Sequence, residues 1–406
     1  MDLARAVNQD IDISVYPATF EMTPLYFMRN LFYLGIIGII LFEFLNVYLI
    51  MPMPGSQQMD SLEAAYFLHT NRWYFRVLFL VFTLAGTPSA FRKSRWIPFL
   101  LIMIAVSVSY VFNFRLNAES MFREPLNLTF ANRSENTLND SSLVLAVSSG
   151  VTAKAYPIRF IGYHHQVRDS IDGKPILVTY CTVCRTGRVY EPIINGKTEQ
   201  FRLVGMDHFN AMFEDVTTRS WWRQVSGEAV VGPLKGTQLP EIESQQLTLG
   251  KFFFLYPFGQ VMQADDASVI NYDSLARYEK GLSISHLTRR DSLSWNDKSW
   301  VLGVMIGNSC KAYDWNHLLK VGVINDVVDS VPVAIVLSAD GQSFSAFERP
   351  AMNQILFVRN DTLLVGNLQF DFNGNGISDS THRLKRISVY QEYWHSWRTF
   401  HPDTKR

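Results

Sequence analysis

The sequence predicts an all-α membrane anchor of three transmembrane helices, followed by a mostly β (β-rich α+β) extracytoplasmic domain built from two internal repeats. Long apolar runs are confined to about the first 115 of 406 residues, which indicates a membrane-embedded part. Short β-type runs fill the remainder, and two stretches of that remainder match at a constant spacing. The predicted boundaries are 1–30 for a cytoplasmic segment, 31–114 for the anchor, 115–141 for a linker, 142–258 for the first repeat, 259–298 for an inter-repeat connection and 299–406 for a second, degenerate repeat.

Three runs have the roughly 20 apolar residues that a membrane-spanning helix needs. They are Leu31–Met51, Trp73–Phe91 and Trp96–Phe114. Tryptophans at the ends of the second and third runs are typical of the membrane interface. Glu43 lies inside the first run, and a carboxyl group there is either functional, protonated or bonded to a neighbouring span.

Basic residues predict the orientation of these spans. Arg92, Lys93 and Arg95 occupy the short loop between the second and third spans, whereas the loop from Pro52 to Asn71 has no Lys or Arg. The positive-inside rule therefore places the N-terminus in the cytoplasm and everything after the third span outside it. We expect a protein of the inner (cytoplasmic) membrane, in contact with the lipid bilayer, whose C-terminal domain is periplasmic or otherwise extracytoplasmic.

The extracytoplasmic part repeats itself. Residues 142–191 align without a gap onto residues 299–348 at an offset of 157, with twelve identities in fifty positions. The ends of the two stretches match at an offset of 145, since Leu249 and Pro257 align with Trp394 and Pro402. The second copy is therefore shorter by 157 − 145 = 12 residues in its middle. We interpret the two stretches as copies of one supersecondary unit.

Two of the three cysteines, Cys181 and Cys184, lie in the run VTYCTVCRTGR. A Cys-x-x-C spacing brings two sulfurs close enough to chelate one ion or to close a small disulfide ring. The second copy has Ser338 and Gly341 at the matching positions. The restriction of Cys181 and Cys184 to one copy favours an active half and a structural half.

The segments GVTAKAYPIRFIGYHHQVRD, VTYCTVCRTGRVY and MFEDVTTRSWWRQVSGEAVVGPLKGTQL together resemble the bacterial and archaeal family called domain of unknown function 3179. The resemblance extends from Gly150 to Pro257. His165 stands where the family has Glu, and Arg185 stands where it has Gly after the second cysteine. The residues that match the family pattern directly are His164, Asp169, Cys181, Cys184, Asp215, Thr218, Ser220, Trp222, Gln224 and Gly227. The resemblance implies no established activity.

The first functional hypothesis is a soft or borderline metal site. Two thiolates with thioether or imidazole ligands suit copper or zinc. His164 and His165, which we expect on a β-type run, and Met206 and His208 are the candidates that would complete the ligand set of Cys181 and Cys184.

The alternative hypothesis is a thiol-redox or envelope interaction module in which Cys181 and Cys184 form a disulfide. An oxidising compartment favours this form, and the nearby Arg185 and Arg188 would stabilise an open thiolate. An envelope protein would then be the partner. The third reading is two packed free thiols that behave as small hydrophobic side chains.

Two further clusters are weaker candidates. Polar residues around two tryptophans form either a ligand site or a turn network; this group is Asp169, Asp215, Thr218, Ser220, Trp222 and Gln224. The run DFNGNGISD imitates the start of a calcium loop with Asp371, Asn373, Asn375 and Asp379, but His382 stands where a bidentate Glu is required, so an Asn-Gly hairpin explains it equally.

Several classes of function find no support in the sequence. Haem c attachment needs a His where Arg185 stands, and the phosphate-binding glycine patterns of nucleotide enzymes do not occur. A formal net charge of zero gives no reason to expect nucleic acid as a partner.

Overall fold

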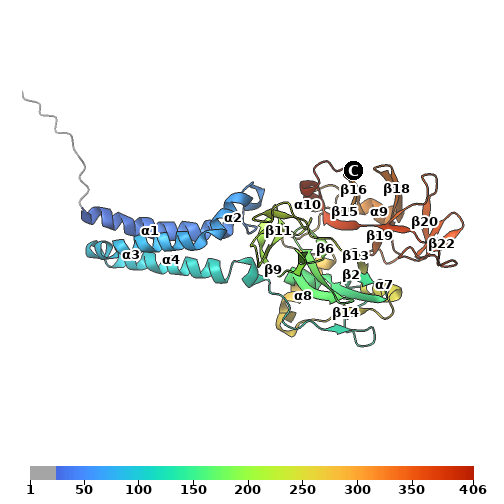
Figure 1. Cartoon of the computed structure of the whole chain (residues 1–406), viewed down its shortest axis with the longest axis horizontal. Helices are drawn as coiled ribbons and strands as arrows, with labels where there is room; N and C mark the ends of the chain where they lie inside the picture. Colours follow the sequence, from blue (N-terminus) through green and yellow to red (C-terminus); the bar gives the residue numbers. More distant parts are fainter. Residues whose placement is uncertain (1–23) are drawn as a thin grey trace, which may run out of the picture. The chain divides into compact units, whose positions relative to one another are not determined.

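The computed structural model describes residues 24–406, so most of the predicted cytoplasmic segment lies outside the described residues. The chain divides into two compact units, whose helices and strands are drawn in Figure 1. The described part of the first unit comprises residues 24–44 and 71–110, and the second unit comprises residues 45–70 and 111–406. The loop between the first two long helices therefore belongs to the unit that contains the β-sheets.

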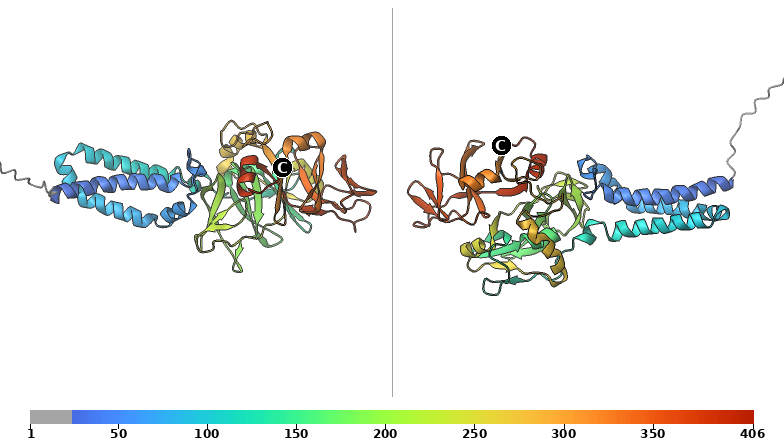
Figure 2. Two further views of the ribbon diagram at one scale, coloured as in Figure 1. Left: turned by 90° about the horizontal axis from the view of Figure 1, so that it is seen from above. Right: turned by 180° about the vertical axis from the view of Figure 1, so that it is seen from behind.

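Three long helices form the first unit: α1 (Pro24–Tyr48), α3 (Arg72–Lys93) and α4 (Trp96–Phe114). Each is long and apolar enough to cross a membrane by length and composition. Figure 2 shows the three helices lying side by side from two further directions. The prediction of an N-terminal helical part is confirmed, although α1 begins seven residues before the predicted first span (31 − 24 = 7).

Glycines bring the backbones of α1 and α3 into close approach. A Cβ atom on Gly86 would lie 2.4 Å from the carbonyl oxygen of Met28, and a Cβ atom on Gly35 would lie 2.6 Å from that of Phe79. Small residues at such contacts are typical of helix packing in membranes, where dispersion contacts replace the hydrophobic effect. Gly86, which interrupts the apolar pattern of the sequence, is thus a packing residue.

Glu43 on α1 is bonded to Arg76 on α3. Arg76 Nε donates to Glu43 Oε1 at 2.7 Å, and Arg76 Nη2 donates to Glu43 Oε2 at 2.9 Å. Only 3% of Glu43 is exposed, so a buried carboxylate has a bidentate partner of opposite charge. This is one of the three alternatives that the sequence left open for Glu43.

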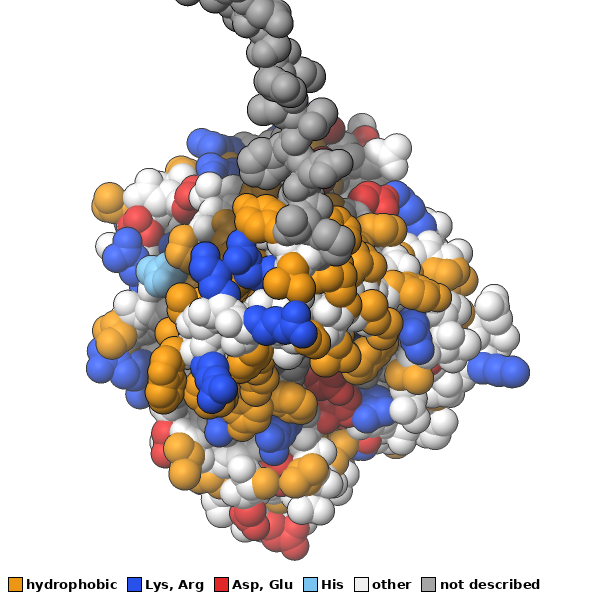
Figure 3. Space-filling model, turned by 90° about the vertical axis from the view of Figure 1, so that its left-hand side faces the viewer, with side chains coloured by type: hydrophobic (Ala, Val, Ile, Leu, Met, Phe, Trp, Pro, Cys, Tyr) orange, Lys and Arg blue, Asp and Glu red, His pale blue; other side chains and the backbone are white. Residues whose placement is uncertain are grey.

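Basic side chains lie at one end of α3, whose last turn carries Arg92 and Lys93. Figure 3 turns the left-hand side of Figure 1 toward the reader and shows Lys and Arg side chains among hydrophobic ones on that face.

The second unit contains short helices and short strands. Its helices are α2 (Leu62–Thr70), α5 (Ala118–Met121), α6 (Ile158–His164), α7 (Leu249–Leu255), α8 (Val269–Glu279), α9 (Trp315–Val321) and α10 (Trp394–Phe400), with the 3-10 turns η1 (Ser56–Gln58) and η2 (Asp266–Ser268). Its strands are β1 (Phe130–Ala131), β2 (Leu143–Ser149), β3 (Thr152–Pro157), β4 (Gln166–Ile171), β5 (Lys174–Cys181), β6 (Thr186–Tyr190), β7 (Ile193–Ile194), β8 (Lys197–Thr198), β9 (Phe201–Asp207), β10 (Asn210–Asp215), β11 (Trp221–Arg223), β12 (Ala229–Val231), β13 (Ser244–Thr248), β14 (Gln260–Met262), β15 (Trp300–Ile306), β16 (Ser309–Asp314), β17 (Val323–Val328), β18 (Val331–Leu337), β19 (Phe344–Glu348), β20 (Leu356–Arg359), β21 (Thr362–Val365), β22 (Leu368–Phe370), β23 (Lys385–Ile387) and β24 (Val389–Tyr393).

These strands form many small sheets, so the prediction of a sheet-rich domain is confirmed. Nearly all pairs are antiparallel; β14 and β3 pair in parallel. In order across each sheet, the strands are β1-β14-β3-β2-β13, β12-β11-β10-β9, β16-β15-β24, β17-β18-β19-β23, β20-β21-β22, β4-β5-β6 and β7-β8.

The order of elements is the same in the two stretches that the sequence relates. Strands β2 and β3, helix α6 and strand β4 begin 157 residues before β15, β16, α9 and β17, as in 300 − 143 for β2 and β15. The closing pairs, β13 with α7 and β24 with α10, are 145 residues apart (389 − 244). That the stretches are copies of one unit stays a prediction, and this common order agrees with it.

The stretch 115–141, expected to be a linker, is packed against the sheets. It contains α5, whose Ala118 is only 3% exposed, and β1, in which Phe130 pairs with Met262 of β14. The apolar side chains of this polar stretch are too few to produce a periodic pattern, which explains why the sequence suggested no structure there.

Candidate functional site

The two cysteines lie on the hairpin of β5 and β6. Strand β5 ends at Cys181, which pairs with Thr186 at the start of β6, and Cys184 lies in the turn between them. Arg185 has a φ of 60°, the left-handed conformation that glycine adopts most easily, and it stands where the family pattern noted above has Gly. Both cysteine side chains are fully buried, with 0% exposure.

The two thiols face each other without a bond between the sulfurs. Phe209, between β9 and β10, directs its carbonyl oxygen at both: it lies 3.5 Å from Cys181 Sγ and 3.3 Å from Cys184 Sγ. Asn210 Nδ2 donates to Cys184 Sγ at 3.4 Å. A carbonyl oxygen and an amide thus cover the pair on the side of the β9–β10 turn.

The surroundings shift the pKa values of the two thiols in opposite directions. Burial would raise the pKa of Cys181, but a hydrogen bond from Cys184 and bonds from the backbone amides of Ala211, Cys184 and Val183 lower it below its ordinary value. Burial and the neighbouring Cys181 raise the pKa of Cys184 well above its ordinary value. Cys181 is therefore the thiol that ionises first.

A lysine and a histidine from distant parts of the chain lie beside the pair. Lys298 Nζ donates to the carbonyl oxygens of Val183 at 2.9 Å and Leu287 at 2.5 Å. His395 Nε2, on α10, lies 3.0 Å from Lys298 Nζ and 3.1 Å from the Val183 oxygen. Both groups therefore contact the turn that carries Cys184.

Burial also shifts the pKa values of these two bases. It lowers the pKa of Lys298 to about 8, against the opposing effect of the two cysteine sulfurs. Burial and the charge of Lys298 lower the pKa of His395 to about 3, so this imidazole is neutral. Lys298 is a positive charge that interacts electrostatically with both sulfurs.

Arg185 and Arg188 do not serve the thiols as the sequence suggested. Arg185 Nε donates to Gln391 Oε1 at 2.9 Å, and its guanidinium carbon lies 3.7 Å from the centre of the Trp300 ring. Arg188 Nη2 donates to Glu392 Oε1 at 2.8 Å. The prediction that these arginines stabilise a thiolate is wrong, because both guanidinium groups bind other partners, which for Arg185 include the carbonyl oxygens of Tyr278 and Glu279.

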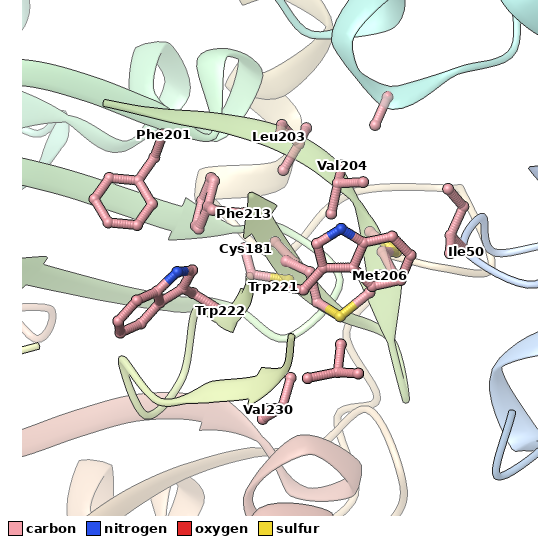
Figure 4. Packing of buried hydrophobic residues seen from close by; sticks show 14 of the residues in the cluster. Ile50, Cys181, Phe201, Leu203, Val204, Met206, Phe213, Trp221, Trp222 and Val230 are labelled. Atoms are coloured by element: carbon pink, nitrogen blue, oxygen red, sulfur yellow. The ribbon is translucent and has the colours of Figure 1, made fainter. Parts of the chain in front are cut away.

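Met206 belongs to the same buried hydrophobic cluster as both cysteines. Figure 4 shows it beside Trp221 and Cys181, with Ile50 on the other side. Ile50 comes from the segment after α1, and its carbonyl oxygen accepts a hydrogen bond from the Met206 amide at 2.7 Å. The loop that follows α1 is therefore built into the cysteine site.

The histidine candidates have other partners. His164 ends α6 rather than lying on a strand, and its ring nitrogens contact the Arg123 carbonyl oxygen and, at 2.5 Å, the Tyr272 hydroxyl. His165 stacks on Phe122, with ring centres 4.4 Å apart. The expectation of a β-type run at these two residues is wrong.

His208 lies on the β9–β10 turn next to Phe209. Its Nδ1 lies 2.7 Å from the carboxylate of Asp207. Across residues 24–406, no group of three or more His, Cys, Asp or Glu side chains is arranged to hold a metal ion. A four-ligand site with Cys181, Cys184 and these histidines is therefore not preformed.

The family described as "Protein of unknown function (DUF3179)" matches residues 125–404, more than half of the chain. The chain belongs to this family. No curated protein and no solved structure matches it. The DUF3179 match covers both halves of the sheet-bearing part, whereas the sequence resemblance was noted only as far as Pro257.

The DUF3179 residues around Asp215 form a turn network. Asp215 Oδ2 accepts hydrogen bonds from the Thr218 hydroxyl at 2.8 Å and from Trp222 Nε1 at 2.9 Å, and the Ser220 amide lies 3.1 Å from the same oxygen. This geometry is that of the turn-network alternative.

Two other DUF3179 residues differ in what they touch. Gln224 Nε2 donates to Thr179 Oγ1 at 3.1 Å, and Gln224 Oε1 accepts from Asn210 at 3.1 Å, so Gln224 supports the amide that contacts Cys184. Asp169 accepts from Lys154 at 2.8 Å and from the Tyr156 hydroxyl at 2.6 Å. Only Gln224 is thus connected to the cysteine pair.

The calcium-loop candidate binds its own backbone. Asp371 Oδ1 accepts from the amides of Asn373 at 2.9 Å and Asn375 at 2.8 Å. Asp379 Oδ1 accepts from the Thr381 amide at 2.9 Å. These bonds are those of Asx turns, which fits the hairpin alternative.

A pocket of about 600 Å³ lies over the β9–β10 turn. Its lining includes Met53 and Gln57 from the loop after α1, Phe209 from the turn, and Lys298 and His395 from the far part of the chain. Phe209 connects the pocket to the thiols, since it lines the pocket and its carbonyl oxygen contacts both sulfurs. The cysteines of this DUF3179 protein therefore lie one residue beneath a pocket of ligand size.

Sequence reasoning missed several of these residues. Phe209 and Asn210 lie in the run MDHFNAM, which drew attention only for Met206 and His208. Lys298 and His395 have no local signal, because they meet the cysteines only through the tertiary fold.

Proposed function

We propose that this protein performs thiol–disulfide exchange through Cys181 and Cys184. One observation carries the proposal: two unbonded, fully buried thiols face each other, and backbone hydrogen bonds from Ala211, Cys184 and Val183 favour ionisation of Cys181. This asymmetry prepares one thiol as the nucleophile and keeps the other protonated as its partner. The DUF3179 description names no activity with which this proposal could conflict.

The exchange proceeds through a mixed disulfide. The Cys181 thiolate attacks one sulfur of a partner's disulfide, and the partner's second sulfur leaves with a proton. Cys184 then loses its proton and attacks Cys181 Sγ, which forms the Cys181–Cys184 bond and releases the partner as a dithiol. Two electrons and two protons pass to the partner, and the reverse sequence oxidises a partner dithiol. Lys298 favours the thiolate by its charge, and an envelope protein is the partner we propose.

A second candidate is a copper or zinc ion held by the same thiols. The shared burial of the Met206 side chain with Cys181 and Cys184 favours it, because two thiolates and a thioether suit copper(I). The Phe209 carbonyl oxygen, within 3.5 Å of both sulfurs, would lie beside such an ion. The absence of three grouped His, Cys, Asp or Glu side chains within residues 24–406 makes this the second choice.

The compartment forms part of the proposal. We propose that α1, α3 and α4 span the inner membrane with the basic residues at the end of α3 in the cytoplasm, which leaves residues 115–406 outside. The charge difference between the two short loops supports this orientation. A reporter enzyme that works only outside the cytoplasm should then be active when it is fused after residue 406.

Thiol counting combined with elemental analysis distinguishes the two candidates. The full chain, purified in lipid nanodiscs, is oxidised with glutathione disulfide, and its thiols are alkylated and counted by mass. We expect two thiols to disappear and Cys310 to remain, with no change in a Cys181→Ser, Cys184→Ser variant. Copper or zinc at one atom per chain, lost in that variant, would instead support the metal site.

A further inference from the structure

The pocket above the cysteines has one wall at the end of a candidate membrane span. Tyr48 is the last residue of α1, and its hydroxyl donates to the Pro54 carbonyl oxygen at 2.8 Å. Pro54 and the adjacent Pro52 and Met53 line the pocket. The chain from Tyr48 to Met53 is five residues long and can extend at most roughly 18 Å. This wall therefore lies within that distance of the end of α1.

The pocket has more cationic than anionic side chains, and its other polar groups both donate and accept hydrogen bonds. Lys298, Arg398, His208 and His286 line it, and its one carboxylate, Asp297, accepts from Arg398 at 2.8 Å. The remaining walls are largely apolar, from Met53, its flanking prolines, Leu287 and Phe209. Such a lining favours a largely apolar molecule with oxygen acceptors and no positive charge.

The floor of the pocket is a conformationally unfavourable turn over the thiols. His208 has a φ of 48° and Phe209 a φ of 67°, left-handed conformations that bulky residues rarely adopt. Gln57, from the wall next to α1, accepts the Phe209 amide hydrogen bond at 3.1 Å. A shift of this turn would remove the Phe209 carbonyl oxygen from both sulfurs and open them to the pocket.

We propose that the pocket binds a lipid-phase quinone, which accepts the electrons of the reduced cysteine pair. The inference rests on the proposed thiol–disulfide exchange and names the small-molecule substrate of that same site. A quinone matches the largely apolar walls, and its carbonyl oxygens can accept hydrogen bonds from Arg398 and from the imidazoles of His208 and His286.

The electron transfer is a two-electron oxidation of the pair. The Cys181 thiolate adds to a ring carbon of the quinone, and Cys184 loses its proton and attacks Cys181 Sγ. The sulfur–sulfur bond forms as the sulfur–carbon bond breaks, and the ring leaves as a quinol with two protons. One quinone is consumed for every two thiols lost.

The test follows the full chain, reduced and embedded in nanodiscs, with decylubiquinone and with glutathione disulfide as separate oxidants. We expect decylubiquinone to remove two thiols per quinone reduced. A bulky side chain in the pocket, in Met53→Trp, should lower the ratio of the quinone rate to the glutathione rate about tenfold, a loss equivalent to one decade of affinity. Thr399, an exposed residue of α10, also lines the pocket. Thr399→Trp should therefore lower the same ratio of rates. Ile377→Trp, an exposed position outside the pocket, should leave the ratio unchanged.

The outcomes distinguish failure of the quinone site from failure of the thiol–disulfide exchange function. Oxidation by glutathione disulfide with no reaction of decylubiquinone would overturn the quinone site and leave the exchange function standing. An unchanged ratio in both tryptophan variants would also overturn it. If neither oxidant formed the Cys181–Cys184 disulfide, the exchange function itself would be contradicted.

Discussion

Arg188 and Glu392 form an ion pair in which neither side chain has any solvent exposure, with Arg188 Nη2 2.8 Å from Glu392 Oε1. Arg188 follows Cys184 on the hairpin of β5 and β6, and Glu392 lies on β24 in the other half of the unit. The guanidinium carbon of Arg188 also lies 3.3 Å from the centre of the Tyr390 ring. The backbone supports the same connection, since the Tyr393 amide donates to the Cys184 carbonyl oxygen at 2.9 Å. The half that lacks the Cys-x-x-C pair therefore fixes the hairpin that carries it.

Breaking this pair should destabilise the fold strongly. Arg188→Met leaves Glu392 buried without its partner, at an expected cost of about 3–5 kcal/mol. The double variant Arg188→Met, Glu392→Gln should lose much less, because the fully buried Glu392 is then neutral and only the partly exposed Glu241, 3.6 Å from Arg188, loses a charged partner. Thermal unfolding of the full chain in nanodiscs measures both, and Lys385→Ala, at an exposed pair with Glu348, is the matched control. Equal losses in the single and double variants would contradict this account.

Removing the charge of Lys298 should make Cys181 harder to ionise. A positive charge near a thiol favours the thiolate, so Lys298→Met should raise the pH at which oxidation by glutathione disulfide reaches half its maximal rate. The rate at neutral pH should fall several-fold. Lys385→Met, far from the thiols in sequence and highly exposed, provides the comparison. A pH profile identical to that of the parent chain would show that Lys298 has only a packing role.

His165 should make the fold sensitive to acid. Burial lowers its pKa from 6.5 to about 4, so the unfolded chain binds a proton below about pH 6.5 while the folded chain stays neutral to about pH 4. Stability should be unaffected above this window and should fall by up to about 3 kcal/mol as the pH decreases through it. His165→Asn, a residue that tolerates the left-handed conformation, should flatten that slope in unfolding curves recorded across the window. A slope retained in the variant would assign the acid sensitivity to other groups.

The pair of Glu43 and Arg76 should be required for stable packing of the helices. Arg76→Met removes both hydrogen bonds of its guanidinium to the buried Glu43 carboxylate, which costs several kcal/mol. Combining it with Glu43→Gln should restore most of the loss, because the amide carries no charge. The yield of monodisperse protein and its thermal unfolding in nanodiscs report the effect. If the double variant were as unstable as Arg76→Met alone, charge burial would not be the cause.

Gly205 should be essential for attaching the segment after α1. A Cβ atom at this position would lie 2.4 Å from the Ile50 carbonyl oxygen, which accepts the neighbouring Met206 amide. Gly205→Ala should therefore cost about 1–3 kcal/mol by overpacking and should expose the loop 49–61 to proteases. Gly173→Ala places a side chain on a left-handed residue with a φ of 74° but meets no atom within 4 Å, so it should leave that loop protected. Equal protection in both variants would argue against the contact.

The sequence predicted the elements whose signals are local. The three long helices followed from the lengths of apolar runs, and the common order of elements in the two stretches agrees with the repeat pattern. The residues around His164 were misjudged because the run AYPIRFIGY is rich in β-branched and aromatic residues, yet its second part forms the short helix α6. Tertiary packing overrides local propensity in an element of seven residues.

The site was predictable only where it is local. The spacing of Cys181 and Cys184 identified the hairpin, but Lys298 and His395 join it from more than one hundred residues away. Arg185 and Arg188 looked like partners of the thiols because they are close in sequence. On a β-hairpin, side chains close in sequence can point to opposite faces, and here both arginines bind the other half of the unit.

The attachment of residues 45–70 to the β-sheets has a practical consequence. A fragment that starts after the third helix, at residue 115, would lack Ile50, Gln57 and the proline-rich wall, and so would carry an incomplete version of its own pocket. Removing the helices to gain solubility therefore also removes residues that complete the pocket. Activity measured on such a fragment would not represent the full chain.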